Sequence, residues 1–149
     1  MTKTEIDTEM EENQMTAHEY LEQIKTQDKK VNMMRIKLKM LRDSMGLKAV
    51  SYESIGAKPS NHQTDTMAEA VGKIIDYEDE VKEEEAKLAI LRFDAEKAIQ
   101  MLDDENEREV LERWYLLFQS IEVIKEEMTY SARRIYEFRK SGLEKIVLI

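Results

Sequence analysis

The sequence predicts an all-α chain, in which a long antiparallel, coiled-coil-like helical hairpin precedes a C-terminal three-helix unit containing a helix-turn-helix. Three observations predict this fold class. Charged residues make up 37% of the 149 residues, against a typical ~25%. One Pro and four Gly leave few breaks between helical segments. Apolar residues recur at seven-residue spacing along two long stretches, which is typical of paired helices.

The first long helix is expected after a disordered acidic tail over residues 1–15. Thr16-Ala-His-Glu19 has the form of a capping box, in which each of the two polar side chains satisfies a free backbone N–H. Gly46 supplies the C-terminal stop. The apolar stripe between them consists of Ile24, Val31, Leu38 and Met45, with Tyr20, Met34 and Leu41 at the interleaved positions.

A loop over residues 47–65, predicted to be mobile, holds Gly56 and Pro59 and lacks a helical period. A second capping box, Thr66-Met-Ala-Glu69, is expected to open a longer helix. That helix carries its own seven-residue stripe of Met67, Ile74, Val81, Leu88, Ala95 and Leu102. Matching stripes joined by a loop predict a helical hairpin over residues 16–102.

The C-terminal unit is expected over residues 103–149. A third capping box, Asp104-Glu-Asn-Glu107, predicts a helix Glu105–Phe118, and Ser120 and Ser131 are expected to cap two further helices. A tight break at 129–131 separates these last two helices, as in a helix-turn-helix. The apolar residues expected in this unit are Val110, Leu111, Trp114, Tyr115, Phe118, Ile121, Ile124, Met128, Ile135, Phe138 and Ile146.

Charge is distributed unevenly along the chain. The net charge of −9 argues against nucleic acid as a partner of the whole surface. Residues 16–48, however, have eight Lys/Arg against four Asp/Glu, whereas residues 61–112 have six against seventeen. This balance favours pairing of the two hairpin helices over contact of the first helix with DNA phosphates. Residues 131–149 have five basic against two acidic residues, so the last helix is locally basic.

No catalytic, metal or cofactor site is predicted. The chain has no Cys, and His18 and His62 are isolated, so zinc is not expected. The carboxylates between Asp76 and Glu85 lack the glycine turns of a calcium loop and are expected to form a solvated helix face. The polar N-terminus does not resemble a signal peptide, and the longest apolar run, 146–149, is too short to span a bilayer. We therefore expect a soluble, non-enzymatic protein of the cytoplasm.

With these elements in place, the chain resembles the phage and prophage late-transcription regulators of the ArpU/RinA type, and more distantly region 4 of bacterial sigma factors. The resemblance covers most of the chain from about residue 16. Its most specific part is MTYSARRIYEFRKSGLEKI, in which Tyr130-Ser131, Arg133, Ile135-Tyr136 and Leu143-Glu-Lys-Ile146 match the family's pattern. Two positions depart from that pattern: Phe118 replaces a small, turn-permissive residue, and Lys125 replaces an alanine.

The resemblance implies a sequence-specific binder of duplex DNA that acts on phage late promoters without enzymatic activity. Early positions of a reading helix face base edges, where Arg can pair with guanine. The expected base readers are Ser131, Arg133, Arg134 and Glu137, and the expected phosphate contacts are Tyr130, Arg139 and Lys140. Tyr136 is also expected to contact the DNA. The same charges are also ordinary on the exposed face of a terminal helix.

Two other functions remain open at this stage. One is a helical adaptor that binds protein rather than DNA. The other is a DNA-packaging component similar to a small terminase subunit, which also combines a helix-turn-helix with an oligomerising region. The expected partners of a regulator are duplex DNA and RNA polymerase, with a homodimer formed through the hairpin.

Overall fold

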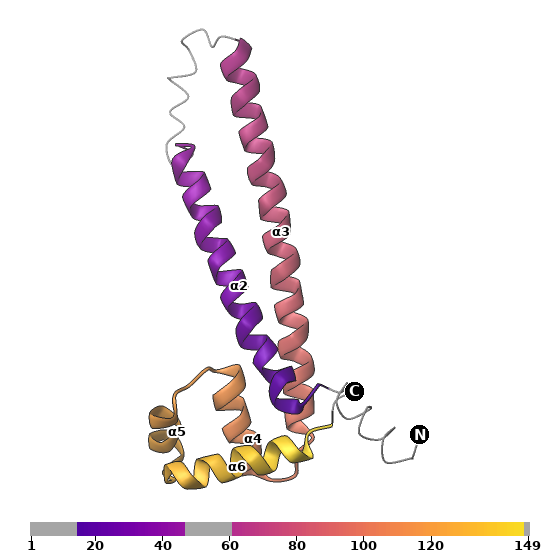
Figure 1. Ribbon diagram of the computed structural model, residues 1–149, viewed down its shortest axis with the longest axis vertical. Coiled ribbons are helices and arrows are strands. Elements are labelled where there is room, and N and C mark those ends of the chain that lie inside the picture. Colours follow the sequence, from indigo (N-terminus) through magenta and orange to yellow (C-terminus); the bar gives the residue numbers. More distant parts are fainter. Residues whose placement is uncertain (1–14, 47–60, 148–149) are drawn as a thin grey trace, which may run out of the picture. The chain divides into compact units, whose positions relative to one another are not determined.

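The computed structural model describes residues 15–46 and 61–147, and every regular element within them is helical, which confirms the all-α prediction. The predicted tail and loop lie outside the described residues, except for Met15 and residues 61–65. Figure 1 shows the order of the elements along the chain. They are α2 (Ala17–Ser44), α3 (Asn61–Gln100), α4 (Glu105–Leu111), the π-helical turn η3 (Glu112–Leu116), α5 (Ile121–Met128) and α6 (Ala132–Lys145).

Helix α2 begins and ends where its local signals predict. The Glu19 backbone N–H donates to Thr16 Oγ1 at 3.2 Å, and the Thr16 N–H donates to Glu19 Oε2 at 3.3 Å. Both halves of the capping box are therefore formed. At the other end Gly46 has a φ of +67°, a left-handed conformation that costs glycine little and stops the helix.

The chain divides into two compact units, one of Gln27–Ala89 and one of Met1–Thr26 with Ile90–Ile149. We call them the hairpin unit and the C-terminal unit. In the hairpin unit α2 and α3 run side by side and antiparallel (Figure 1). The predicted stripes form the seam between them, since its buried side chains are Val31, Leu38, Ile74, Val81 and Leu88.

One position of the seam is polar on both helices. Gln27 Nε2 donates to Glu84 Oε2 at 2.6 Å and to the Glu84 backbone carbonyl at 3.0 Å. The Glu84 side chain is only 12% exposed, and Lys30 and Lys87 also pair with it. These contacts lower the pKa of Glu84 to about 2, chiefly through the Gln27 and Lys87 hydrogen bonds. A half-buried polar pair within an apolar seam favours one register of the two helices, because any slip separates the two partners.

Opposite charges also pair across the hairpin. Lys30 Nζ lies 3.3 Å from Glu84, Arg35 Nε lies 3.0 Å from Glu85, and Arg42 pairs with Glu78. The prediction that the basic first helix pairs with the acidic second helix is confirmed.

Helix α3 begins at Asn61, five residues before the start predicted from the Thr66 capping box. That prediction was wrong because residues 61–65 contain no Gly or Pro. Once a helix is nucleated, each further residue adds a hydrogen bond at little cost. Met67, expected in the seam, is 52% exposed near this end.

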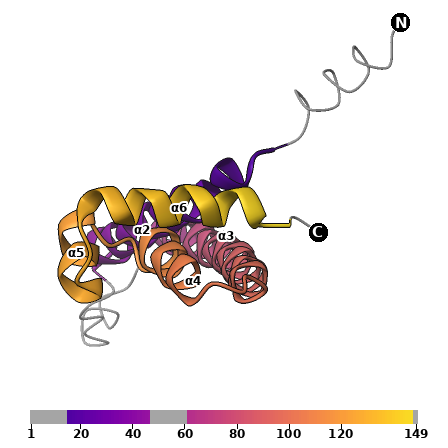
Figure 2. The same cartoon turned by 90° about the horizontal axis from the view of Figure 1, so that it is seen from below.

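The C-terminal unit collects α4, η3, α5 and α6 (Figure 2). Val110, Ile124, Met128, Ile135 and Phe138 form its core, against which Trp114 and Ile121 pack. Leu111 and Tyr115 are also buried, as predicted, whereas Ile146 is only half-buried. None of the described helices is long and apolar enough to cross a membrane.

The predicted helix Glu105–Phe118 is not regular throughout. It is α-helical to Leu111 and then widens into the π-turn η3, where the Leu117 N–H donates to the Glu112 carbonyl at 3.0 Å. Phe118 ends the segment in a left-handed conformation with φ +53°. The spacing of apolar residues is nearly the same in a regular α-helix and in one that contains a single π-turn. The sequence therefore did not predict the π-turn.

Candidate nucleic-acid interface

Helices α5 and α6 and the three-residue turn between them form the candidate interface. Ser120 caps α5 by accepting from the Val123 N–H at 3.4 Å, and Ser131 caps α6 by accepting from the Arg134 N–H at 3.3 Å. Thr129 between them is left-handed, with φ +57° and ψ +37°. The two serine caps and the tight break at 129–131 are therefore confirmed.

The core under this turn fixes the orientation of α6. Ile124 and Met128 of α5 pack against Ile135 and Phe138 of α6, with Val110 of α4 completing the cluster. Close packing continues further along α6, because a Cβ on Gly142 would lie 3.0 Å from Leu111 Cδ1. Helix α6 is thus held along its length, and its outer face is left to solvent.

The local structure accommodates both Lys125 and Phe118. The side chain of Lys125 is exposed, so its chain extends outward and does not enter the α5–α6 contact. Phe118 adopts the left-handed backbone that a small residue would favour, and the guanidinium of Arg92 lies 5.3 Å from the centre of its ring. Arg92 also donates to the Leu116 carbonyl at 3.1 Å, so it fastens the end of η3.

Three predicted base readers form a small charged group on the outer face of α6. Arg133 Nε lies 3.4 Å from one carboxylate oxygen of Glu137, and Arg134 Nη1 lies 3.0 Å from the other. The Arg133 side chain is 91% exposed. Arg134 also lies over the Phe138 ring, 4.5 Å from its centre. Exposed ion pairs of this kind contribute only ~0.2–1 kcal/mol, so a stronger anionic partner can replace Glu137.

The aromatic residues of the candidate set brace the arginines and the turn. The Tyr130 ring meets Phe138 edge to face at 5.2 Å, and its hydroxyl accepts from Asn106 Nδ2 at 3.3 Å. Tyr136 meets Trp114 edge to face at 5.8 Å. Both tyrosines remain partly exposed, so their rings are positioned while their outer edges face solvent.

Arg139 and Lys140 differ although they are neighbours in sequence. Arg139 is half-buried, with its guanidinium 4.6 Å from the centre of the Trp114 ring and 5.9 Å from that of Tyr136. Lys140 is exposed. Both line an open hollow of about 430 Å³ whose other walls are Thr16, Ala17, His18, Tyr136, Leu143 and Glu144. Lys140 is therefore the more accessible cation of the two.

A buried carboxylate that sequence reasoning assigned only to a capping box fastens α6 to α4. The Glu107 side chain is 5% exposed. Ser141 Oγ donates to its Oε1 at 2.6 Å, and Lys145 Nζ donates to both oxygens at 2.8 and 3.2 Å. The bond to Glu107 raises the pKa of Lys145 above its ordinary value. The Asp104 cap is formed, with the Glu107 N–H donating to Asp104 Oδ1 at 3.0 Å, but the Glu107 side chain does not return to complete the box.

His18 is not isolated in space as it is in sequence. Its Nδ1 lies 2.6 Å from the hydroxyl of Tyr115, which is buried in the C-terminal unit. Burial raises the pKa of Tyr115. Residue types alone gave no sign of this pair, because the two residues are 97 positions apart.

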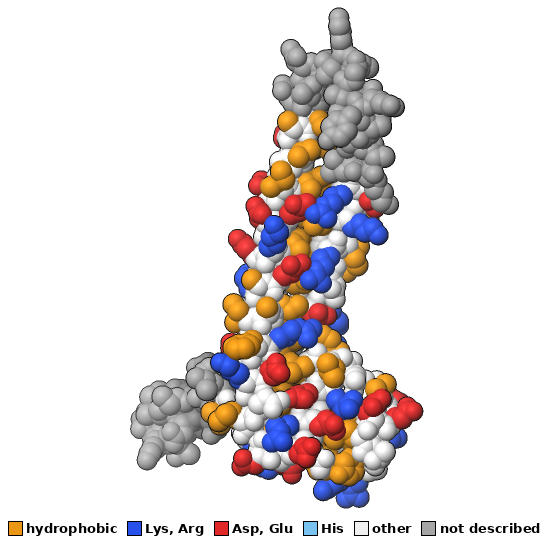
Figure 3. Space-filling model, turned by 180° about the vertical axis from the view of Figure 1, so that it is seen from behind, with side chains coloured by type: hydrophobic (Ala, Val, Ile, Leu, Met, Phe, Trp, Pro, Cys, Tyr) orange, Lys and Arg blue, Asp and Glu red, His pale blue; other side chains and the backbone are white. Residues whose placement is uncertain are grey.

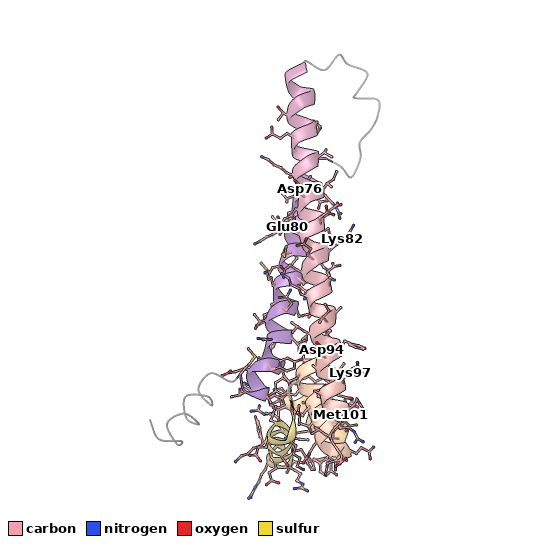
Figure 4. The ribbon with its side chains drawn as sticks, turned by 90° about the vertical axis from the view of Figure 1, so that its right-hand side faces the viewer. Asp76, Glu80, Lys82, Asp94, Lys97 and Met101 are labelled. Atoms are coloured by element: carbon pink, nitrogen blue, oxygen red, sulfur yellow. The ribbon has the colours of Figure 1, made fainter. Side chains whose placement is uncertain are left out.

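The carboxylates between Asp76 and Glu85 lie along helix α3. Figure 4 labels Asp76 and Glu80 on α3, where both side chains are exposed. Among the described residues, no group of three or more His, Cys, Asp or Glu side chains is arranged to hold a metal ion.

Comparisons of the chain with protein-family models, with curated proteins and with solved structures found no match.

Proposed function

We propose that the chain binds duplex DNA through α6 and serves as a phage or prophage transcription regulator without enzymatic activity. The observation that carries the proposal is the pair Arg133 and Arg134. They stand in the first turn of a serine-capped helix whose opposite side is anchored in a core. In a helix-turn-helix, this part of the second helix meets base edges in the major groove.

The free energies of the two kinds of contact favour replacement of Glu137 by DNA as the partner of the arginines. A bidentate arginine–guanine contact is worth about 1–3 kcal/mol of discrimination, whereas each exposed pair with Glu137 is worth about 0.2–1 kcal/mol. The arginines therefore remain available to bases while Glu137 limits their motion in the free protein. Ser131 lies next to them at the helix start, and Tyr130, Arg139 and Lys140 are proposed to contact phosphates.

The proposal is tested by measuring affinity for a duplex selected by the protein. Arg133→Ala or Arg134→Ala is expected to weaken specific binding by ~1–3 kcal/mol without unfolding the protein. Arg133→Lys/Arg134→Lys keeps the charge but loses the guanidinium fork, so it should retain nonspecific affinity and lose sequence preference. Lys73→Ala/Lys82→Ala removes two exposed charges from α3 and serves as the matched control. Equal losses in the Ala and control variants would show that only net charge matters.

In this proposal the hairpin mediates homodimerisation or contact with RNA polymerase. A helical adaptor that binds only protein is the second candidate, and exposed apolar residues on both hairpin helices favour it. A packaging component similar to a small terminase subunit would instead form ring-sized oligomers. Light scattering of the purified protein distinguishes a ring from a dimer or monomer.

A further inference from the structure

The side of α2 that faces away from α3 carries an apolar stripe that packing within the hairpin does not use. Met33, Ile36 and Met40 are 52%, 54% and 65% exposed. Their spacing of three and four residues places them on one helix face. The seam residues Val31 and Leu38 occupy the opposite face. Hydrophobic side chains recur among charged ones along the hairpin on the face drawn in Figure 3.

Exposed charges of opposite sign continue this stripe at its two ends. Lys29 lies four residues before Met33, and Asp43 lies three residues after Met40. The same helix face therefore presents, in order, a basic side chain, three apolar side chains and an acidic side chain. At 1.5 Å per residue it extends over about 21 Å.

Two copies of this helix face are complementary when they lie antiparallel. When two such helices lie antiparallel with their Ile36 residues adjacent, Lys29 of each copy faces Asp43 of the other. Met33 of each then faces Met40, and the apolar side chains meet between the charged ends. A contact that uses the same patch on both subunits must have this property, because a twofold axis exchanges the two patches.

We infer that a second copy of this chain docks on the Lys29–Asp43 face of α2, forming an antiparallel α2–α2 contact. The contact is modest, since a single pair of helix faces this short buries less than the roughly 1,200–2,000 Å² of stable complexes. Lys37 of both copies lies beside the axis, and its ammonium extends outward on its apolar stem. The dimer is therefore weak and depends on concentration. The inference specifies the homodimer of the proposed function and does not depend on DNA binding.

Sedimentation velocity of the full chain over a concentration series, without DNA, tests the contact. Wild type is expected to pass from monomer to dimer as concentration rises. Ile36→Gln/Met40→Gln should raise the dissociation constant at least about tenfold while the helical circular dichroism is unchanged. Ile75→Gln is the matched control, because Ile75 is an apolar residue of α3 with the same 52% exposure as Met33. A wild type that stays monomeric, or a dimer weakened only by Ile75→Gln, would overturn the inference.

A charge exchange tests the antiparallel direction. Lys29→Asp places Asp opposite Asp43 at both ends and should weaken the dimer about fivefold or more. Adding Asp43→Lys restores opposite charges and should return the dissociation constant to within about twofold of wild type. Failure of the double variant to recover would exclude this pairing. DNA affinity of Arg133→Ala/Arg134→Ala is measured separately, so failure of the dimer leaves the DNA proposal open.

Discussion

The hairpin unit and the C-terminal unit are stabilised in different ways. Two helices enclose only a narrow apolar seam in the hairpin, and charged contacts across it align the helices. In the C-terminal unit several short helices surround a common core, and each is capped or fastened by a specific side chain. The stability of the hairpin should therefore vary with pH and salt. The stability of the C-terminal unit depends on packing, so this unit is better suited to hold a binding surface in one conformation.

The largest expected effect comes from replacing a buried isoleucine by alanine, once in each unit. Ile124→Ala should lower the free energy of unfolding of the C-terminal unit by about 3–5 kcal/mol, because Ile124 is fully enclosed. Ile74→Ala in the hairpin seam should cost about 2 kcal/mol, since two helices can collapse around the lost volume. Denaturant unfolding followed by Trp114 fluorescence reports the C-terminal unit, because Trp114 is the only tryptophan, and the loss of helical circular dichroism over the same denaturant range adds the hairpin. Equal costs at the two sites would remove the distinction between the units.

Replacing the buried carboxylate should have the next largest effect. Glu107→Gln preserves the shape of the side chain but removes its charge, leaving the Ser141 and Lys145 contacts weakened. We expect a loss of about 1–3 kcal/mol and a fall in the pKa of Lys145 toward its ordinary value. Chemical denaturation and an NMR titration of the Lys145 ammonium measure the two effects. A Lys145 pKa that does not move would refute the proposed contact.

The turn between α5 and α6 offers a stabilising change. Thr129→Gly should add about 0.5–1 kcal/mol to the free energy of unfolding, because glycine adopts a positive φ without a Cβ penalty. Phe118→Gly relieves a similar strain but loses the ring and its contact with Arg92, so it should stabilise less or destabilise. Thermal melts of the two variants provide the comparison. A larger gain at Phe118 than at Thr129 would mean that the ring contributes nothing.

The smallest effect, and the one confined to the hairpin, is its response to acid. The pKa of Glu84 is lowered from 4.5 to about 2, so its charged form stabilises the fold. That contribution is present above about pH 4.5 and is lost as the pH falls through about 2. Glu84→Gln should therefore make the melting temperature of the hairpin less dependent on pH in this window. Unchanged pH dependence would show that Glu84 gains nothing from Gln27 and its lysines.

Local signals in the sequence predicted the fold well where they act within a few residues. The Thr16, Asp104, Ser120 and Ser131 caps all lie where side-chain chemistry placed them, and the heptad stripes form the seam. The early start of α3 and the π-turn were not predicted, because neither has a distinctive residue pattern.

The residues of the candidate interface, in the turn and on α6, were predicted from the sequence, but their contacts were not. Sequence spacing allowed Glu137 to pair with both arginines, yet it did not show that Arg139 stacks on Trp114. The links between distant positions, Glu107 with Lys145 and His18 with Tyr115, arise only from tertiary packing. No short-range pattern carries that information.

Selection of bound fragments from a random duplex library at near-physiological salt shows whether α6 reads the sequence of duplex DNA. Wild type and Arg133→Ala/Arg134→Ala are run in parallel. We expect wild type to enrich a motif that the double variant, which keeps its fold, does not enrich. Enrichment by neither protein, or the same motif from both, would mean that α6 does not read sequence.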